Sequence, residues 1–192
     1  MRKGIITLLL LSFLAIGCTP KHGGVQTEEA ADIFPDYTEV VIPSNIAPLN
    51  FNINNEGSSF VTMISGEKSG ELTVKGQKVR IPLKGWKSLI EANIGADLLF
   101  VIDVKREGKW IRLSQFKCHV AEEPIDEYLV YRLLAPSYEF YTAFSIRQRD
   151  ITTGKDREVY NNRMHYNPKE QQCMNCHQFQ NYRTENWQMH VR

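Results

Sequence analysis

Five consecutive residues near the C-terminal end of the chain have the types and spacing to hold a metal centre: Cys173-Met174-Asn175-Cys176-His177. This is the C-x-x-C-H pattern of covalent haem c attachment. Two thiols separated by two residues can reach the two vinyl groups of one porphyrin, and the imidazole that follows is then held beneath the iron as an axial ligand. We therefore predict one covalent haem c, with Cys173 and Cys176 as thioether anchors and His177 as the proximal ligand.

The same residues could serve two other chemistries. Cys173 and Cys176 form a C-x-x-C pair, which could be a redox couple or a structural disulfide. They could also bind Zn²⁺ together with two histidines, for which His165, His177 and His190 are available. The redox interpretation lacks the strand–helix–strand context of a thioredoxin-like domain. The haem interpretation agrees with an export signal at the N-terminus, because haem c is attached outside the cytoplasm.

An iron ligand on the other face of the haem would come from another histidine or methionine. The candidates are Met164, His165, Met174, Met189, His190 and His119. Met174 lies within the attachment motif and cannot easily reach the opposite face of the ring. We select His190, which follows the motif and could fold back over the porphyrin. A histidine there would give a lower reduction potential than a methionine.

The N-terminus is typical of an exported bacterial lipoprotein. Arg2 and Lys3 precede an apolar stretch over residues 5–16, which is too short to span a bilayer. Gly17 stands directly before Cys18, as in a lipobox, where a lipid is attached to the cysteine thiol and the chain is cut before it. We predict a signal peptide over residues 1–17 and lipidation of Cys18.

The residues after Cys18 predict how the protein is held. Residues 18–32 are mostly polar and are expected to form a flexible tether. Thr19, not aspartate, follows the cysteine, and by resemblance to other lipoproteins this favours the outer membrane, with the protein facing the periplasm or the surface. More than one acyl chain would make the anchor stable.

The elements that must position the motif are predicted to be β-strands. Apolar residues alternate with a period of two over most of residues 33–160, for example from Leu98 to Val104. After a turn at Glu107-Gly108, the strand from Trp110 to Val120 changes phase, which predicts a bulge near Ser114-Gln115. We expect an immunoglobulin/fibronectin-like antiparallel β-sandwich, followed over residues 161–192 by a short irregular or helical segment that carries the C-x-x-C-H motif.

One helix and one cysteine complete the expected core. Trp86, Leu89 and Ile90 stand at helical spacing and predict one amphipathic helix. Cys118 is in phase with Phe116 and is expected to be a buried free thiol, since free cysteine behaves as a small apolar residue.

Composition excludes several classes of protein. The chain has 192 residues and a formal net charge of +1, from 23 Lys+Arg against 22 Asp+Glu, so phosphate neutralisation does not drive binding to nucleic acid. Its hydrophobic share of 42% is that of a folded domain, not of a disordered chain. Four cysteines are too few for a disulfide scaffold. Paired carboxylates, a phosphate-binding glycine loop and a Ser-His-Asp order are not recognisable.

Several stretches resemble a known family. These are Ile33–Tyr37 (IFPDY), Val41–Phe51 (VIPSNIAPLNF), Pro82–Lys87 (PLKGWK), Tyr128–Leu133 (YLVYRL) and Cys173–His177 (CMNCH). Together they resemble TolB-like lipoproteins of Gram-negative bacteria. The resemblance implies export, an N-terminal β domain and the haem motif. A β-propeller usually follows the motif in that family, so the resemblance also implies that this chain is the N-terminal part of a larger design, or truncated.

The function expected from these patterns is electron transfer or redox sensing by a lipid-anchored protein with a protein redox partner. The alternative is a lipid-anchored β-sandwich that binds a polysaccharide or a protein, with Trp86 and Trp110 as aromatic platforms and the cysteines as a disulfide or metal staple. Enzymatic activity is the least favoured class, because a peroxidase-like reaction would need an open position at the iron.

Overall fold

The computed structural model describes residues 23–133, 144–164, 169, 174–181 and 183–191, with the backbone alone for 174–177, 183–185 and 191. The described chain is mainly β, with one α-helix, α1 (Leu83–Ala92), which confirms the predicted class. The strands are β1 (Val25–Gln26), β2 (Ile33–Phe34), β3 (Val40–Ile42), β4 (Phe51–Ile53), β5 (Ser59–Gly66), β6 (Glu71–Lys75), β7 (Lys78–Val79), β8 (Asp97–Arg106), β9 (Lys109–Arg112), β10 (Phe116–Val120), β11 (Tyr128–Leu133), β12 (Ser145–Asp150), β13 (Asp156–Asn161), β14 (Met174–Gln180) and β15 (Arg183–Val191).

The main sheet is built around β8, the strand with the clearest alternation in the sequence. One edge of β8 pairs antiparallel with β5, which in turn pairs with β6. The other edge is shared by β9 and β10, both antiparallel to β8. Two short strands extend the sheet in parallel, with β1 beside β9 and β3 beside β10. These seven strands are called the main sheet below.

The predicted bulge is present where β9 passes into β10. Arg112 pairs with Asp103, whereas Phe116 pairs with Phe100, so four residue steps on one strand lie opposite three on β8. The extra residue reverses the alternation beyond it. Phe116, Cys118 and Val120 are buried as a result.

A small sheet and α1 enclose the first hydrophobic core together with the main sheet. The small sheet runs in the order β2-β4-β7, with Phe51 paired with Val79. As predicted, α1 buries Trp86, Leu89 and Ile90. Trp86 is 0% exposed and its Nε1–H donates to the Ile46 carbonyl at 2.9 Å, so the largest core side chain also has its polar atom satisfied.

A second, separate hydrophobic cluster lies in the C-terminal part. Here β11, β12 and β13 form an antiparallel sheet, called the β11–β13 sheet, and β14 pairs with β15 in the C-terminal hairpin. Phe144 and Ile146 are buried at its centre. The partly buried apolar side chains packed against them are Val130, Val159, Tyr160, Trp187 and Met189. The predicted boundary at residue 161 therefore falls inside this cluster, which joins the β11–β13 sheet to the hairpin.

The C-terminal segment differs from the irregular or helical structure expected of it. Residues 174–180 and 183–191 are strands, joined by a turn in which Asn181 has φ 51°. Asparagine tolerates this left-handed conformation, which tight hairpin turns require. Phe179 and Trp187 are direct cross-strand partners, and their rings stack with centroids 6.3 Å apart. Such aromatic pairs stabilise neighbouring strands.

The described part of the predicted tether, residues 23–32, is attached to the main sheet. Val25 pairs with Ile111 through the β1–β9 ladder. The Glu29 carboxylate accepts two hydrogen bonds from the Arg106 guanidinium, at 2.6 and 2.7 Å. This bidentate contact lowers the pKa of Glu29 and fixes the segment before β2.

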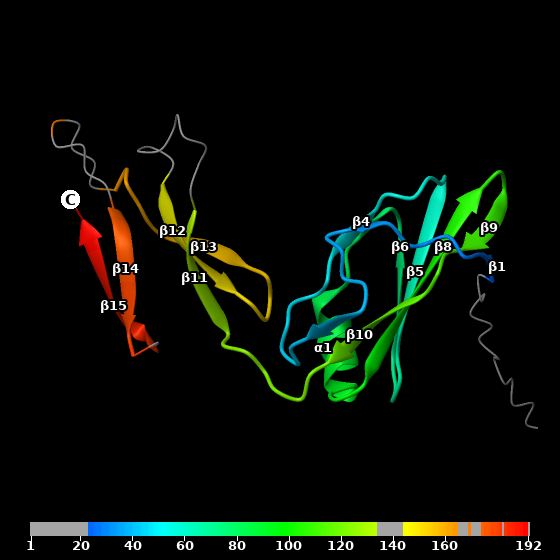
Figure 1. Ribbon diagram of the computed structural model, residues 1–192, viewed down its shortest axis with the longest axis horizontal. Helices are drawn as coiled ribbons and strands as arrows, with labels where there is room; N and C mark the ends of the chain where they lie inside the picture. Colours follow the sequence, from blue (N-terminus) through cyan, green and yellow to red (C-terminus); the bar gives the residue numbers. More distant parts are fainter. Residues whose placement is uncertain (1–22, 134–143, 165–168, 170–173, 182, 192) are drawn as a thin grey trace, which may run out of the picture.

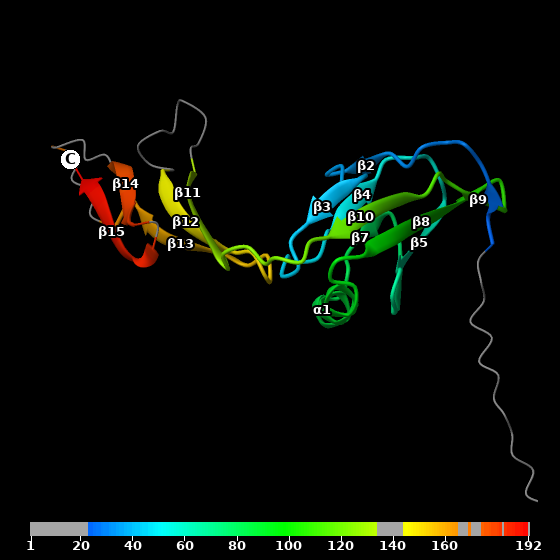
Figure 2. The ribbon, with the colours of Figure 1, turned by 60° about the horizontal axis from the view of Figure 1, so that its bottom comes forward.

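The two cores are arranged along the long axis of the molecule (Figures 1 and 2). The main sheet with β1 occupies one end and the C-terminal hairpin the other. Between them the Asn45 amide exchanges two hydrogen bonds with the Ile125 backbone, and the Ala47 N–H donates to the Ile151 carbonyl at 2.7 Å. Within the described residues, no helix has the length and apolarity needed to cross a membrane.

Candidate functional site

Only some of the predicted site residues lie in the part of the chain that the structure describes. Cys18 and Cys173 lie outside the described residues, as does His165. Cys176 and His177 belong to β14, where the backbone is described. His190 belongs to β15 and is exposed. The structure thus brings the second half of the C-x-x-C-H motif and the predicted second ligand onto the two paired strands of one hairpin.

The register of this hairpin is interrupted within the motif. Met174 pairs with Val191, whereas His177 pairs with Met189, so β14 has one residue more than β15 between these pairs. In a regular strand, residues three apart face opposite sides of the sheet. A bulge between two such residues reverses the alternation. The extra residue of β14 lies between Met174 and His177, the interval that contains Cys176.

Alternate side chains of β15 pack against the second cluster and so attach the hairpin to the rest of the protein. Trp187 and Met189 are partly buried and pack against Phe144 and Ile146 of the second cluster. The residues between and beside them, Asn186, Gln188 and His190, are exposed. One side of β15 is therefore apolar and docked on the β11–β13 sheet, and the other side is polar and faces solvent.

His190 is placed close to His177 along the ladder, one residue beyond Met189, the partner of His177. Two axial ligands bind opposite faces of a haem, so the porphyrin has to lie between them. Paired strands are only about 4.8 Å apart. Ligation of one iron by both histidines would therefore need β14 and β15 to separate, and His190 stays a prediction as the second ligand.

Other potential ligands do not converge elsewhere. Among the side chains that the structure describes, no three or more histidine, cysteine, aspartate or glutamate residues are grouped so as to hold a metal ion. The strongest polar contact of a histidine is on the main sheet, where His119 Nδ1 lies 2.9 Å from Asp97 Oδ1. Hydrogen bonds from His119 and then from Lys117 lower the pKa of Asp97.

The remaining described cysteine is not reactive. Cys118 is 0% exposed, as the alternation predicted, and its thiol donates to the Tyr37 carbonyl at 3.2 Å. Burial, with the negative charge of Glu39 as a second cause, raises the pKa of Cys118 to about 12. The thiol is therefore protonated near neutral pH, and the side chain is part of the hydrophobic core.

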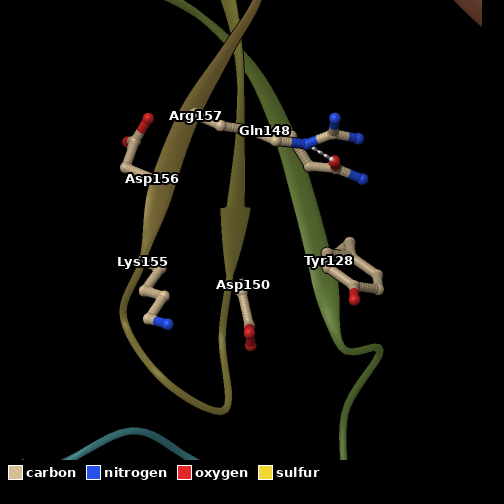
Figure 3. A pocket seen from close by; sticks show the side chains of 6 residues that line it. All are labelled: Tyr128, Gln148, Asp150, Lys155, Asp156 and Arg157. Atoms are coloured by element: carbon tan, nitrogen blue, oxygen red, sulfur yellow. Dashed lines mark hydrogen bonds between the residues drawn. The ribbon is translucent and has the colours of Figure 1, made fainter.

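The β11–β13 sheet carries a hollow of about 610 Å³ that the sequence did not indicate (Figure 3). Its lining residues are Tyr128, Gln148, Asp150, Lys155, Asp156 and Arg157. Five of them come from β11, β12 and β13, and Lys155 directly precedes β13. They form no motif along the chain, so only the pairing of the strands assembles them. Trp86, one of the two aromatic platforms proposed from the sequence, is fully buried and cannot contact a ligand.

No protein-family model matches this chain, and no curated protein and no solved structure matches it significantly. The resemblance to TolB-like lipoproteins therefore stays a prediction.

Proposed function

We propose that this chain is an exported lipoprotein that carries one covalent haem c on its C-terminal hairpin and transfers electrons to or from a protein partner. The observation that carries this proposal is the Cys173-Met174-Asn175-Cys176-His177 sequence. The lipobox-like end of the signal sequence at Cys18 supports it independently, because attachment of haem c takes place outside the cytoplasm.

The donor set fits the cofactor. Cys173 and Cys176 would hold the porphyrin through thioether bonds, and His177 would bind the iron. When bound, the haem supplies one-electron chemistry. The role of the hairpin is to fix the cofactor on the β11–β13 sheet through Trp187 and Met189.

The position of the hairpin supports a proposal for where the redox partner binds. β1 lies at one end of the molecule and the hairpin at the other. Only residues 19–24 separate Cys18 from Val25, the first residue of β1. A lipid on Cys18 would therefore hold the β1 end at the membrane and present the haem away from it. The redox partner would be a protein of the periplasm or the surface.

The scaffold that supports the hairpin is proposed to be an immunoglobulin-like β-sandwich. The main sheet and the small sheet share the first hydrophobic core, which supports a two-layer arrangement.

A mass and absorbance experiment tests the haem. The chain is produced in a bacterial host with cytochrome c maturation, and its intact mass and pyridine haemochrome spectrum are recorded after denaturation. We expect a haem-sized mass increment that survives denaturation and is lost in the double variant Cys173→Ala/Cys176→Ala. Cys118→Ala is the matched control, since Cys118 is a cysteine outside the motif, and it should keep the haem. An unmodified mass in the wild-type chain overturns the proposal.

The second candidate function is a lipid-anchored binding protein whose C-x-x-C pair forms a disulfide or a zinc site. The hollow on the β11–β13 sheet favours it, because it is a concave polar surface that the haem does not require. In that case the denatured mass would lack haem, and it would show either the loss of two hydrogens or, in a native mass spectrum, bound zinc.

A further inference from the structure

The hollow on the β11–β13 sheet combines an aromatic ring and two cations on one face. The strand register places Tyr128 opposite Asp150, and Gln148 opposite Arg157. Lys155 directly precedes β13, two residues before Arg157. Figure 3 shows these five side chains around the open space, with Asp156 directed away from them. The sheet therefore brings together groups that are distant in sequence.

The acidic residues of this hollow are already occupied. Asp150 accepts hydrogen bonds from the hydroxyls of Thr152 and Thr153, at 2.8 and 2.6 Å, and from both of their backbone N–H groups. The bonds from Thr153 and Thr152 lower the pKa of Asp150 to about 2. Asp156 accepts from Arg147 Nε at 2.7 Å and from the Tyr131 hydroxyl on the opposite side of the sheet. Neither carboxylate therefore neutralises the cations by direct contact.

The basic residues keep their charged ends available. Arg157 donates from Nε to Gln148 Oε1 at 2.6 Å, which orients the guanidinium and uses only one of its nitrogens. Within the described part of the chain, the terminal nitrogens of Arg157 and the Lys155 ammonium form no ion pair or hydrogen bond. A planar guanidinium with free terminal nitrogens matches a carboxylate through two parallel hydrogen bonds.

The aromatic residue gives the hollow an apolar component. Tyr128 begins β11 and is 46% exposed, so part of its ring is open to a ligand. The apolar C–H face of a sugar ring packs on such a ring, and the phenol hydroxyl and the Gln148 amide supply polar groups beside it. Lys155 and Arg157 are two residues apart in the sequence, and both side chains border the open space.

We propose that this hollow binds an acidic saccharide, with the sugar ring against Tyr128 and its carboxylate held by Arg157 and Lys155. The site lies on the sheet that supports the hairpin but uses none of the haem-binding residues. A binding test of this site can therefore succeed or fail independently of the proposed electron transfer. Phosphate shares the anionic part of this chemistry but lacks the sugar ring.

Titration of the full mature chain with defined probes tests the site. The probes are trigalacturonate as the acidic saccharide, maltotriose as a neutral saccharide and inorganic phosphate as an anion without a sugar. Binding is followed by calorimetry and by shifts of backbone amide resonances in β11, β12 and β13. We expect trigalacturonate to bind at least tenfold more tightly than maltotriose and than phosphate, and to bind more weakly as salt is raised.

Variants separate the aromatic contribution from the charged one. Tyr128→Ala and Arg157→Gln should each weaken trigalacturonate binding by about tenfold, the loss expected for one good contact. Lys109→Gln, which removes an exposed lysine on β9 far from the hollow, is the matched control and should bind normally. Equal affinity for phosphate and trigalacturonate, equal affinity for maltotriose, or unchanged binding by both variants would each overturn the proposal.

Discussion

The attachment of the C-terminal hairpin can be tested by removing one side chain, in the variant Trp187→Ala. Trp187 lies on β15, packs in the second hydrophobic cluster and stacks on Phe179. A two-stranded hairpin is only marginally stable on its own. The hairpin therefore depends on its contacts with the β11–β13 sheet, and we expect Trp187→Ala to open it while the first core stays folded.

The expected size of this effect follows from the burial of Trp187. Truncating a fully buried aromatic residue to alanine costs about 3–5 kcal/mol. Trp187 is only partly buried, so about 2 kcal/mol is expected. This corresponds to an increase of about 30-fold in the population of the open hairpin. Amide hydrogen exchange measures that population, because an amide exchanges only when its hydrogen bond opens.

The control is Gln188→Ala, which changes the neighbouring exposed residue on the same strand and should leave exchange unchanged. Amides of β5 and β8, in the first core, provide an internal reference. If Trp187→Ala accelerates their exchange as much as that of the hairpin, the two clusters unfold as one unit. If hairpin exchange does not change, Trp187 does not hold the hairpin. Either result would refute the reasoning.

Three further predictions concern single residues. Because burial raises the pKa of Cys118 to about 12, iodoacetamide at pH 8 should label it, by peptide mass spectrometry, at least about 100-fold more slowly in the folded chain than after unfolding. The pKa of Asp150, lowered to about 2, lies below its unfolded value, so this carboxylate stabilises the fold above about pH 4 and that contribution is lost as the pH falls through 2; denaturant unfolding should show that Asp150→Asn lowers stability at pH 6 and has a smaller effect at pH 2. Trp86→Phe removes a buried hydrogen bond to the Ile46 carbonyl and leaves a gap in the first core, so urea unfolding should show a loss of about 2 kcal/mol; an unchanged midpoint would contradict the assigned role.

The parts of the fold that were predicted correctly are those in which one face of an element is buried. The alternation from Leu98 to Val104 predicted β8, and the change of phase before Phe116 predicted the bulge between β9 and β10. The helical spacing of Trp86 and Leu89 predicted α1 in the same way. In each case a local period records the contact with the core, so the sequence alone contains the signal.

Strand pairing was not predictable in the same way, because it depends on contacts between distant residues. The composition of residues 23–32 is polar, yet β1 pairs with β9 and Glu29 binds Arg106, a residue far along the chain. The hollow at Tyr128 and Arg157 likewise exists only after β11, β12 and β13 pair. A polar stretch held by a partner strand and by an ion pair looks the same in sequence as a free linker.

The C-terminal hairpin did leave a local signal that composition obscured. Trp187, Met189 and Val191 are apolar at every second position, which is a strand pattern, although polar residues dominate the segment. The same alternation places His190 on the side opposite Trp187 and Met189. The helical expectation for the segment was wrong because the polar composition hid this period of two.

The packing of the hairpin on the second cluster connects the fold to the proposed chemistry. In the described hairpin, Trp187 and Met189 of β15 pack in the second cluster, and Phe179 of β14 stacks on Trp187. Covalent attachment through Cys173 and Cys176 would need the thiols alone, while the orientation of the haem would depend on Trp187. Loss of Trp187 should therefore leave the haem bound but no longer fixed, which separates attachment from positioning in a single variant.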